Sequence, residues 1–307
     1  MANQREFRVL CYHGVYPDGV NLGRLNSSGK HIKAAMFESQ MRMLREKFRP
    51  VSMNQIVSAL CGVGELPERA VAVTFDDGYE NNFTQAVPIL KRFEIPATFY
   101  LTTGFIGSEK LMWTDLLEAA LFTEKSEQFT LRSSGKEYVF DLNSEASRET
   151  VLTRIKKLCK AFPSEELIEL REMLAADSKI EESLRSAIYG FMSWEQSRAV
   201  ASCDLFSVGA HTVDHVSLAK ARRETVLHQV HSSVQTVTGQ LGTPCLHFAY
   251  PEGQESDIDD YAKEIVKDAG IICAPSAISG SNALASSDPF FLRREMVGFE
   301  GRGFLTP

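Results

Sequence analysis

The chain has 307 residues, of which 44% are hydrophobic and 24% charged, and its net charge is −7. This composition excludes a wholly disordered chain, and the acidic balance disfavours a general nucleic-acid-binding protein, which needs a basic face for phosphates. The six cysteines lie far apart without a C-x-x-C pair, so neither a disulfide scaffold nor a thiolate zinc site is expected. The sequence shows no signal-peptide pattern and no apolar run of about 18 residues, so we expect a cytoplasmic protein without a transmembrane segment.

The first third of the chain alternates between strand and helix patterns. Apolar runs predict strands, and helical periodicity between them predicts helices. In chain order these elements lie at 7–13, 34–48, 54–61, 70–75, 80–94 and 97–101. This alternation is typical of parallel strands joined by crossover helices.

The rhythm changes between residues 106 and 192. A helix is predicted at 113–122, a hairpin at 128–141, and charged helical segments at 144–186. We interpret 106–192 as an insertion of a hairpin plus helices within one domain that spans 1–307. A solvated embellishment without a function is the open alternative.

The alternation returns at residue 193, where Ser193 and Gln196 have the spacing of a helix capping box. Strands are then predicted at 205–210, 245–250, 271–274 and 290–297, and helices at 222–240 and 256–269. Polar residues follow several of the predicted strands, in the order His13, Asp76-Asp77, His211 to His215, and Tyr250 to Gly253. Active sites of parallel α/β barrels gather at this edge of the sheet, so we expect a site there.

Two of these clusters suggest metal chemistry. Adjacent carboxylates at Asp76 and Asp77 repel each other unless a cation lies beside them, although Asp-Asp-Gly is also good turn chemistry. Histidines four apart, His211 and His215, are able to share one helical face and converge on a metal, although two unrelated histidines would show the same spacing. With Asp77 as a third ligand, the set predicts an open hydrolytic site. Asp76 would then take a proton from the activated water.

The same residues resemble a known family. Thr74-Phe75-Asp76-Asp77-Gly78 and His211-Thr212-Val213-Asp214-His215 are similar to two motifs of the NodB-type polysaccharide deacetylases, carbohydrate esterase family four. Tyr12-His13-Gly14-Val15 resembles the Y-H-x-V element of one branch of that family. Further similar segments are 95–99 and 248–253.

The resemblance implies an α/β fold, a distorted and incomplete (β/α) barrel of the NodB-like, seven-stranded type. It implies hydrolysis of an acetyl group on a sugar with one divalent metal ion. We expect zinc, with cobalt, manganese, iron or nickel as alternatives. Asp76 would be the general base, and Asp77, His211 and His215 the metal ligands.

The third motif of the family supplies the expected substrate-binding residues. They are Tyr250, Pro251 and Glu252, with the Glu252 backbone amide helping to hold the oxyanion. Trp113 is expected to line the sugar site, and a hydrophobic anchor for the insertion is its alternative role.

The sequence also departs from the family pattern. Glu252 stands where an aromatic residue is usual, and Ala249 stands where an arginine usually steadies the base. We expect Arg294 to take over that role, the alternative being a surface arginine. The late L-x-H motif that supplies the catalytic acid is absent, so His13 is the candidate acid, with a buried structural histidine as the alternative.

The leading hypothesis is therefore a metal-dependent sugar N-deacetylase. An intracellular enzyme would act on an acetylated sugar, a sugar nucleotide or a lipid-linked saccharide. One alternative is an O-acetyl or other small-amide hydrolase using the same site. Another is a non-catalytic saccharide-binding protein of the same fold. The sequence does not determine the oligomeric state.

Overall fold

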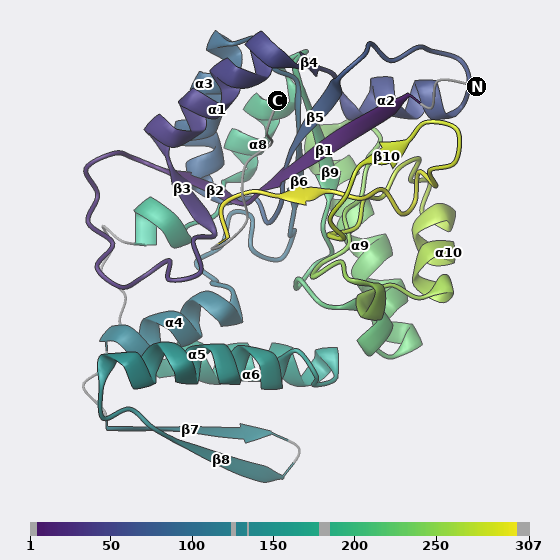
Figure 1. Cartoon of the computed structure of the whole chain (residues 1–307). Helices are drawn as coiled ribbons and strands as arrows, with labels where there is room; N and C mark the ends of the chain where they lie inside the picture. Colours follow the sequence, from purple (N-terminus) through teal and green to yellow (C-terminus); the bar gives the residue numbers. More distant parts are fainter. Residues whose placement is uncertain (1–4, 124–126, 134, 178–184, 300–307) are drawn as a thin grey trace.

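A mostly parallel sheet forms the centre of the computed structural model, which describes residues 5–123, 127–133, 135–177 and 185–299. Its strands follow the order β10-β1-β5-β6-β9, with β11 beside β1 and β4 beside β5 (Figure 1). Only β10 runs antiparallel to its neighbour. The strands are β1 (Glu6–Tyr12), β4 (Arg49–Pro50), β5 (Ala70–Phe75), β6 (Ala97–Leu101), β9 (Phe206–Ala210), β10 (Asn282–Ala283) and β11 (Glu295–Met296).

The last third of the chain closes the sheet into a distorted barrel. Beyond β9, neighbouring segments meet through single parallel bridges, until β11 pairs with β1 and completes the circle. The bridges are Ala210↔Phe248, His247↔Cys273 and Pro275↔Leu292. The strands predicted at 245–250, 271–274 and 290–297 are therefore mostly irregular segments, and β11 is the only part that forms a regular strand. This geometry is the expected incomplete (β/α) barrel.

Helices cover the outside of the barrel because its strands are apolar on both faces. All six residues of β5 are buried, as is typical of a central parallel strand. In α1, Phe37, Met41 and Leu44 recur at helical spacing and are buried against this sheet. The Ser193–Gln196 capping box is confirmed at the start of α8. The covering helices are α1 (Ala34–Lys47), α2 (Met53–Leu60), α3 (Val87–Arg92), α8 (Trp194–Ala201), α9 (Arg223–Leu241) and α10 (Asp260–Asp268).

Short elements lie between these helices and strands. A small parallel pair follows β1, and brief π- or 3-10-helical turns adjoin the longer helices. These elements are β2 (Gly14–Tyr16), β3 (His31–Lys33), η1 (Asn82–Ala86), η3 (Leu218–Lys220) and η4 (Glu255–Asp257). No helix among the described residues is both long and apolar enough to cross a membrane.

Most of the described part of the 106–192 segment lies to one side of the barrel, at the bottom of Figure 1. The predicted hairpin at 128–141 is confirmed as β7 (Gln128–Ser133) and β8 (Lys136–Asp141). With it are α4 (Trp113–Thr123), α5 (Glu145–Cys159), α6 (Ser164–Asp177) and the π-helical turn η2 (Arg185–Tyr189). Part of the helical region predicted at 144–186, namely 178–184, lies outside the described residues. The segment has its own apolar cluster, which includes Trp113, Phe140 and Ile155. Its interpretation as an insertion within one domain stays a prediction.

Close packing between β9 and the bridge segment predicts the effect of a single methyl group. A Cβ atom at Gly209 would lie 2.5 Å from the His247 carbonyl oxygen and 2.8 Å from the Tyr100 ring. We expect Gly209→Ala to lower the free energy of unfolding by about 1–3 kcal/mol, measured by urea denaturation, because the extra atom overpacks the core. The control is Gly239→Ala in α9, where nothing lies within 4 Å of the added atom. That change should stabilise the helix by up to about 1 kcal/mol. Equal stability of the two variants would contradict the packing at β9.

Candidate active site

The polar residues expected at one edge of the sheet lie at the ends of neighbouring strands. His13 follows β1, Asp76 and Asp77 follow β5, and His211 follows β9. Strands β1 and β5 pair directly, and only β6 separates β5 from β9. The carboxyl ends of these parallel strands therefore bring together residues that are far apart in the sequence.

The loop that carries His211 and His215 is irregular, so the expected shared helical face is wrong. The His211 amide donates to the Leu101 carbonyl, and the Val213 and Asp214 amides donate to the side-chain oxygen of Gln229 in α9. These donors are thus unavailable for a helical turn. Thr212 and His215 adopt positive φ angles of 63° and 56° instead. The two imidazole rings still meet, with ring centroids 4.9 Å apart.

Asp77, His211 and His215 form a compact group of potential metal ligands. The Asp77 Oδ1 atom lies 3.2 Å from Nε2 of His215 and 3.6 Å from Nε2 of His211. Asp77 Oδ1 is buried and has no hydrogen-bond partner among the described residues. The Nδ1 atom of His211 lies 2.7 Å from the Ala249 carbonyl oxygen, which requires a proton on Nδ1. The Nε2 lone pair of the neutral ring is then free to face Asp77, as a metal ligand requires.

The electrostatics of this group favour a cation. Burial lowers the pKa of His211 to about 4, so this ring is neutral at pH 7. Burial acts in the same direction on His215, but the Asp77 carboxylate outweighs it and raises the pKa of His215. Burial would raise the pKa of Asp77, yet His215 holds it well below its usual range. An ionised carboxylate beside two imidazole nitrogens attracts positive charge, and these donor types suit a divalent metal.

Asp76 is held by Arg294. Two parallel bonds of 2.7 Å join the guanidinium to both carboxylate oxygens. Arg294 is fully buried, and its Nε atom also donates to the Ser276 carbonyl at 2.6 Å. Burial would raise the pKa of Asp76, but Arg294 outweighs it and lowers the pKa to about 2. The surface-arginine alternative for Arg294 is therefore wrong. Its role beside the base stays a proposal.

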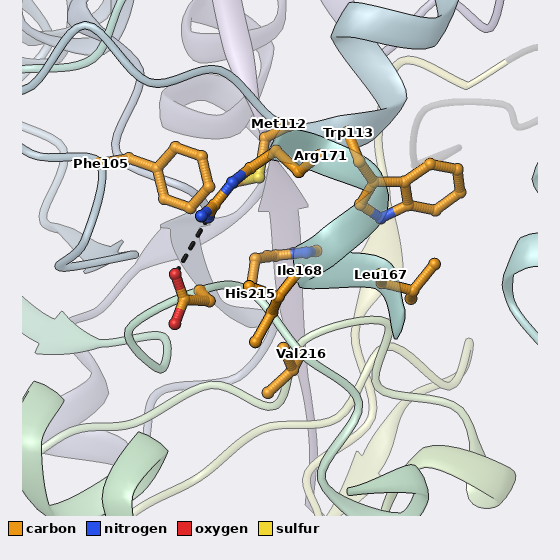
Figure 2. Close-up of a pocket in the computed structure, with 9 residues that line it drawn as sticks. Phe105, Met112, Trp113, Leu167, Ile168, Arg171, His215 and Val216 are labelled. Carbon is orange, nitrogen blue, oxygen red and sulfur yellow. Dashed lines mark hydrogen bonds and ion pairs between the residues drawn. The ribbon is translucent and has the colours of Figure 1, made fainter. Parts of the chain in front are cut away.

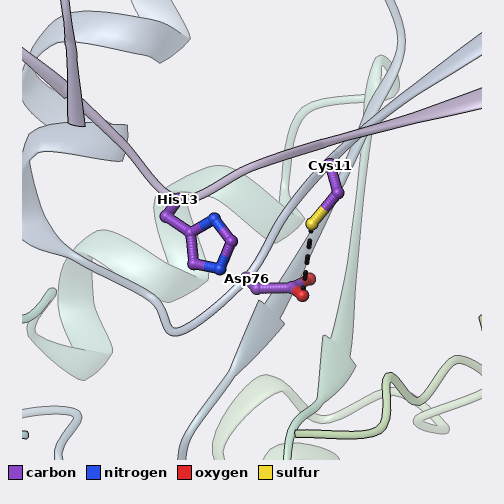
Figure 3. Close-up of side chains that lie close together, drawn as sticks. All are labelled: Cys11, His13 and Asp76. Atoms are coloured by element: carbon purple, nitrogen blue, oxygen red, sulfur yellow. Dashed lines mark hydrogen bonds between the residues drawn. The ribbon is translucent and has the colours of Figure 1, made fainter. Parts of the chain in front are cut away.

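His13 lies beside Asp76, with Cys11 on the other side (Figure 3). Ligand atoms of these three side chains lie within 4.8 Å of one another. The Cys11 thiol donates to Asp76 Oδ2 at 3.3 Å, whereas His13 Nδ1 is buried without a hydrogen-bond partner in the described structure. Burial lowers the pKa of His13, so its ring binds a second proton only weakly.

The third motif is mostly buried. Tyr250 and Pro251 lie in the core, and the Tyr250 hydroxyl has no partner among the described residues. Glu252 is partly exposed, has a positive φ of 58°, and pairs with Lys160 at 2.6 Å. No hydrogen bond from the Glu252 amide is found within the described chain, so this N–H is available as a donor. The structure thus presents Glu252, rather than the Tyr250 ring, toward the site.

A small pocket adjoins His215 and carries Trp113 on its wall (Figure 2). Most of its lining is apolar, and much of it comes from α4 and α6 of the 106–192 segment. The lining residues are Phe105, Met112, Trp113, Leu167, Ile168, Arg171, Asp214, His215 and Val216. Trp113 belongs both to this wall and to the apolar cluster of the segment, so the two roles considered for it are compatible.

Two charged residues near the site were missed in the sequence. The Lys30 ammonium lies 2.7 Å from Asp115 of α4 and contributes to the low pKa of Asp77. Arg171 of α6 bonds Asp214, the residue before His215, at 3.0 Å. Neither belongs to a motif. The available signal was weak: a buried ion pair leaves no periodic pattern when its partners lie 85 or 43 residues apart.

Comparisons with known proteins agree with this geometry. The sequence matches the family described as "Polysaccharide deacetylase" over residues 63–157 and 168–274, more than half of the chain. It is 42% identical over 94 residues to a poly-beta-1,6-N-acetyl-D-glucosamine N-deacetylase of Escherichia coli K12, and 33% identical over 96 residues to one of Staphylococcus aureus. Each alignment covers 30% of this chain, but only 13% and 33% of the two relatives.

A solved structure extends the likeness over nearly the whole chain. IcaB from Ammonifex degensii superposes with a TM-score of 0.61 at 21% sequence identity, covering 95% of this chain and 92% of that chain. This degree of likeness establishes the shared fold.

The three-residue group predicts that the protein binds a metal. We expect about one divalent ion per chain, measured by elemental mass spectrometry after incubation with zinc and gel filtration. Asp77→Ala and His211→Ala should each lose most of it, because each removes one of three protein ligands. His228→Ala is the control, since it removes an exposed histidine of α9. Retention of the ion in both ligand variants would contradict the site.

The buried Asp76–Arg294 pair predicts a large loss of stability when one partner is removed. Arg294→Met should lower the free energy of unfolding by about 3–5 kcal/mol in urea titrations, because it leaves a buried carboxylate without its counter-ion. Arg293→Met alters the exposed neighbour and should change stability by no more than about 0.5 kcal/mol. Adding Asp76→Asn to Arg294→Met should recover part of the loss. The pairing is refuted if Arg294→Met and Arg293→Met unfold alike.

Proposed function

The chain belongs to the polysaccharide deacetylase family, and from this premise we propose that it is a metal-dependent hydrolase that removes an N-acetyl group from a saccharide. The observation that carries the proposal is the pairing of two adjacent carboxylates with different partners. Asp77 faces two histidines with an unbonded oxygen, whereas Asp76 is held by Arg294. Asp77 thus has an oxygen available for a metal, whereas Asp76 is fixed in place and would serve in proton transfer.

Asp77, His211 and His215 would hold the ion, with zinc as the first expectation and cobalt, manganese, iron or nickel as alternatives. A divalent ion in this place polarises the acetyl carbonyl and lowers the pKa of a water molecule. The carboxylate and imidazole donors fit this role because their ligand atoms lie within 4.8 Å of one another. His211 is fixed for it by its bond to the Ala249 carbonyl.

Asp76 would act as the general base. Its low pKa keeps it ionised, and the two-point contact with Arg294 fixes the direction of its oxygens. The carboxylate would accept a proton from the attacking water as the carbon–oxygen bond forms. Arg294 would be the positioning residue for this base, in place of the arginine that Ala249 replaces.

His13 would act as the general acid. It lies beside Asp76, and its buried ring nitrogen Nδ1 has no hydrogen-bond partner among the described residues. The lowered pKa of His13 would make its imidazolium form a ready proton donor, and the proton that it gives to the departing amine would be replaced by the one that Asp76 accepts from the water. Water and the amide would then yield acetate and a free amino group. The Glu252 amide would donate to the oxyanion on the way.

The substrate we propose is a saccharide that contains N-acetylglucosamine, with a β-1,6-linked polymer as the first candidate. The support is that the relatives are named poly-beta-1,6-N-acetyl-D-glucosamine N-deacetylases. None of the comparisons supports the sugar nucleotide, the lipid-linked saccharide or the cytoplasmic location expected from the sequence. Trp113 and Glu252 would contact the sugar, whereas the buried Tyr250 and Pro251 would shape the site from beneath. Tyr12 to Val15 supports membership of the Y-H-x-V branch.

The proposal is tested by acetate release from the zinc-loaded protein. The substrates are an N-acetylated β-1,6-glucosamine oligomer, a nucleotide-activated N-acetylglucosamine and an O-acetylated sugar. We expect release from the oligomer, and a loss of about 10²- to 10⁴-fold in kcat for Asp76→Asn and for His13→Gln at unchanged metal content. Asp259→Asn is the control, because asparagine caps α10 as well as aspartate does.

Each outcome decides between the hypotheses. Release only from the ester would favour the O-acetyl hydrolase. A metal-loaded protein that binds the oligomer without releasing acetate would favour the non-catalytic binding protein.

A further inference from the structure

Asp214, which directly precedes His215, is held from two sides. Gln229 of α9 donates to Asp214 Oδ2 at 2.9 Å, and Arg171 of α6 donates to Oδ1 at 3.0 Å, drawn as the dashed line in Figure 2. Gln229 also accepts the amides of Val213 and Asp214. One contact therefore comes from the barrel, and the other comes from the 106–192 segment.

Arg171 is built into this position. Its side chain is only 7% exposed, and its guanidinium lies 5.3 Å from the ring centroid of Phe105. A buried guanidinium needs a counter-ion, and Asp214, at 17% exposure, is the close one. Glu172 lies 3.8 Å away but is 72% exposed, so solvent screens that contact. The bond from Arg171 to Asp214 is thus the charge-assisted one that fixes the carboxylate.

The backbone beside Asp214 needs such support. His215 has a φ of 56° and Thr212 a φ of 63°, a region that side chains other than glycine occupy at a cost of about 1–3 kcal/mol each. Such strain persists only where surrounding contacts hold the backbone in place. Gln229 holds the amides of the two residues before His215, while Arg171 holds the Asp214 side chain.

We infer that Arg171 is a positioning residue for His215, acting through Asp214, so that the metal centre is complete only with α6 docked against its loop. This inference rests on the proposed role of Asp77, His211 and His215 as metal ligands. The 106–192 segment then contributes to metal affinity as well as to the pocket wall. Partners of a metal ligand commonly change metal affinity by 10- to 100-fold.

The docking of α6 does not depend on Arg171 alone. Ser164 donates to the Ser217 carbonyl at 2.7 Å, and Glu165 accepts from the Arg222 amide and the Thr225 hydroxyl. These contacts lie at the first turn of α6 and do not involve Asp214. Removing the guanidinium should therefore leave the helix in place.

The test is zinc affinity, measured by competition with a chelating dye. Arg171→Met keeps the packing against Phe105 and removes the charge. We expect zinc to dissociate about 10- to 100-fold more readily from it than from the wild type, with Arg171→Lys between the two. Glu169→Met is the matched control on the same helix and should retain wild-type affinity, because Glu169 is exposed and is not among the residues that dock α6 or bond Asp214. The visible absorption of the cobalt form should change in Arg171→Met and not in the control.

A double-mutant cycle separates positioning from general stability. In the Asp214→Ala background, Arg171→Met should cause no further loss of zinc affinity, since its route to His215 is already broken. The inference would be overturned if Arg171→Met lowered zinc affinity as much in the Asp214→Ala background as in the wild type. It would also be overturned if Arg171→Met alone kept wild-type zinc affinity. Thermal melting of the metal-free proteins identifies a variant that fails to fold. If Arg171→Met fails to fold, the zinc affinity of Arg171→Lys decides whether the inference holds. If the wild type itself binds no zinc, the proposed function fails rather than this inference alone.

Discussion

Two neighbouring carboxylates are buried at the end of one strand, and each needs its own positive partner. Asp76 and Asp77 follow the fully buried β5, where water cannot screen their mutual repulsion. Arg294, which lies 218 residues further along the chain, neutralises the charge of Asp76. The second charge faces His211 and His215 with an oxygen that no described group bonds. Closure of the barrel brings Arg294 to Asp76, and the loop after β9 brings His211 and His215 to Asp77.

Backbone strain is concentrated at the same edge. Of the seven non-glycine residues with positive φ in the described chain, four are Asp77, Thr212, His215 and Glu252. Residues other than glycine keep such conformations only where surrounding contacts hold the backbone in place. Side-chain acceptors, above all Gln229, bind the amides that these turns release from regular structure.

The 106–192 segment touches this edge at three charged points. Asp115 binds Lys30, Lys160 binds Glu252, and Arg171 binds Asp214. Buried charge pairs add little net stability, but they specify geometry because a wrong partner leaves a charge unpaired. Lys30–Asp115 and Arg171–Asp214 are such buried pairs, whereas Lys160 is 49% exposed. The segment also supplies much of the apolar wall beside His215.

The sequence by itself determined the elements that depend on neighbouring residues. The apolar run of β5, the capping box at Ser193 and the hairpin at 128–141 are features of neighbouring residues, and the structure forms them as predicted. Asp77, His211 and His215 were singled out by residue type and spacing, and Arg294 by its resemblance to a family strand.

Only the tertiary structure decided how those residues meet. It replaced the expected helical face at 211–215 with a loop, reduced most late strands to single bridges, and buried Tyr250. It also introduced Lys30 and Arg171. The reason is physical: hydrogen bonds and ion pairs between distant segments are set by how the barrel closes and α6 docks. A pattern with a period of two or 3.6 residues carries no record of that.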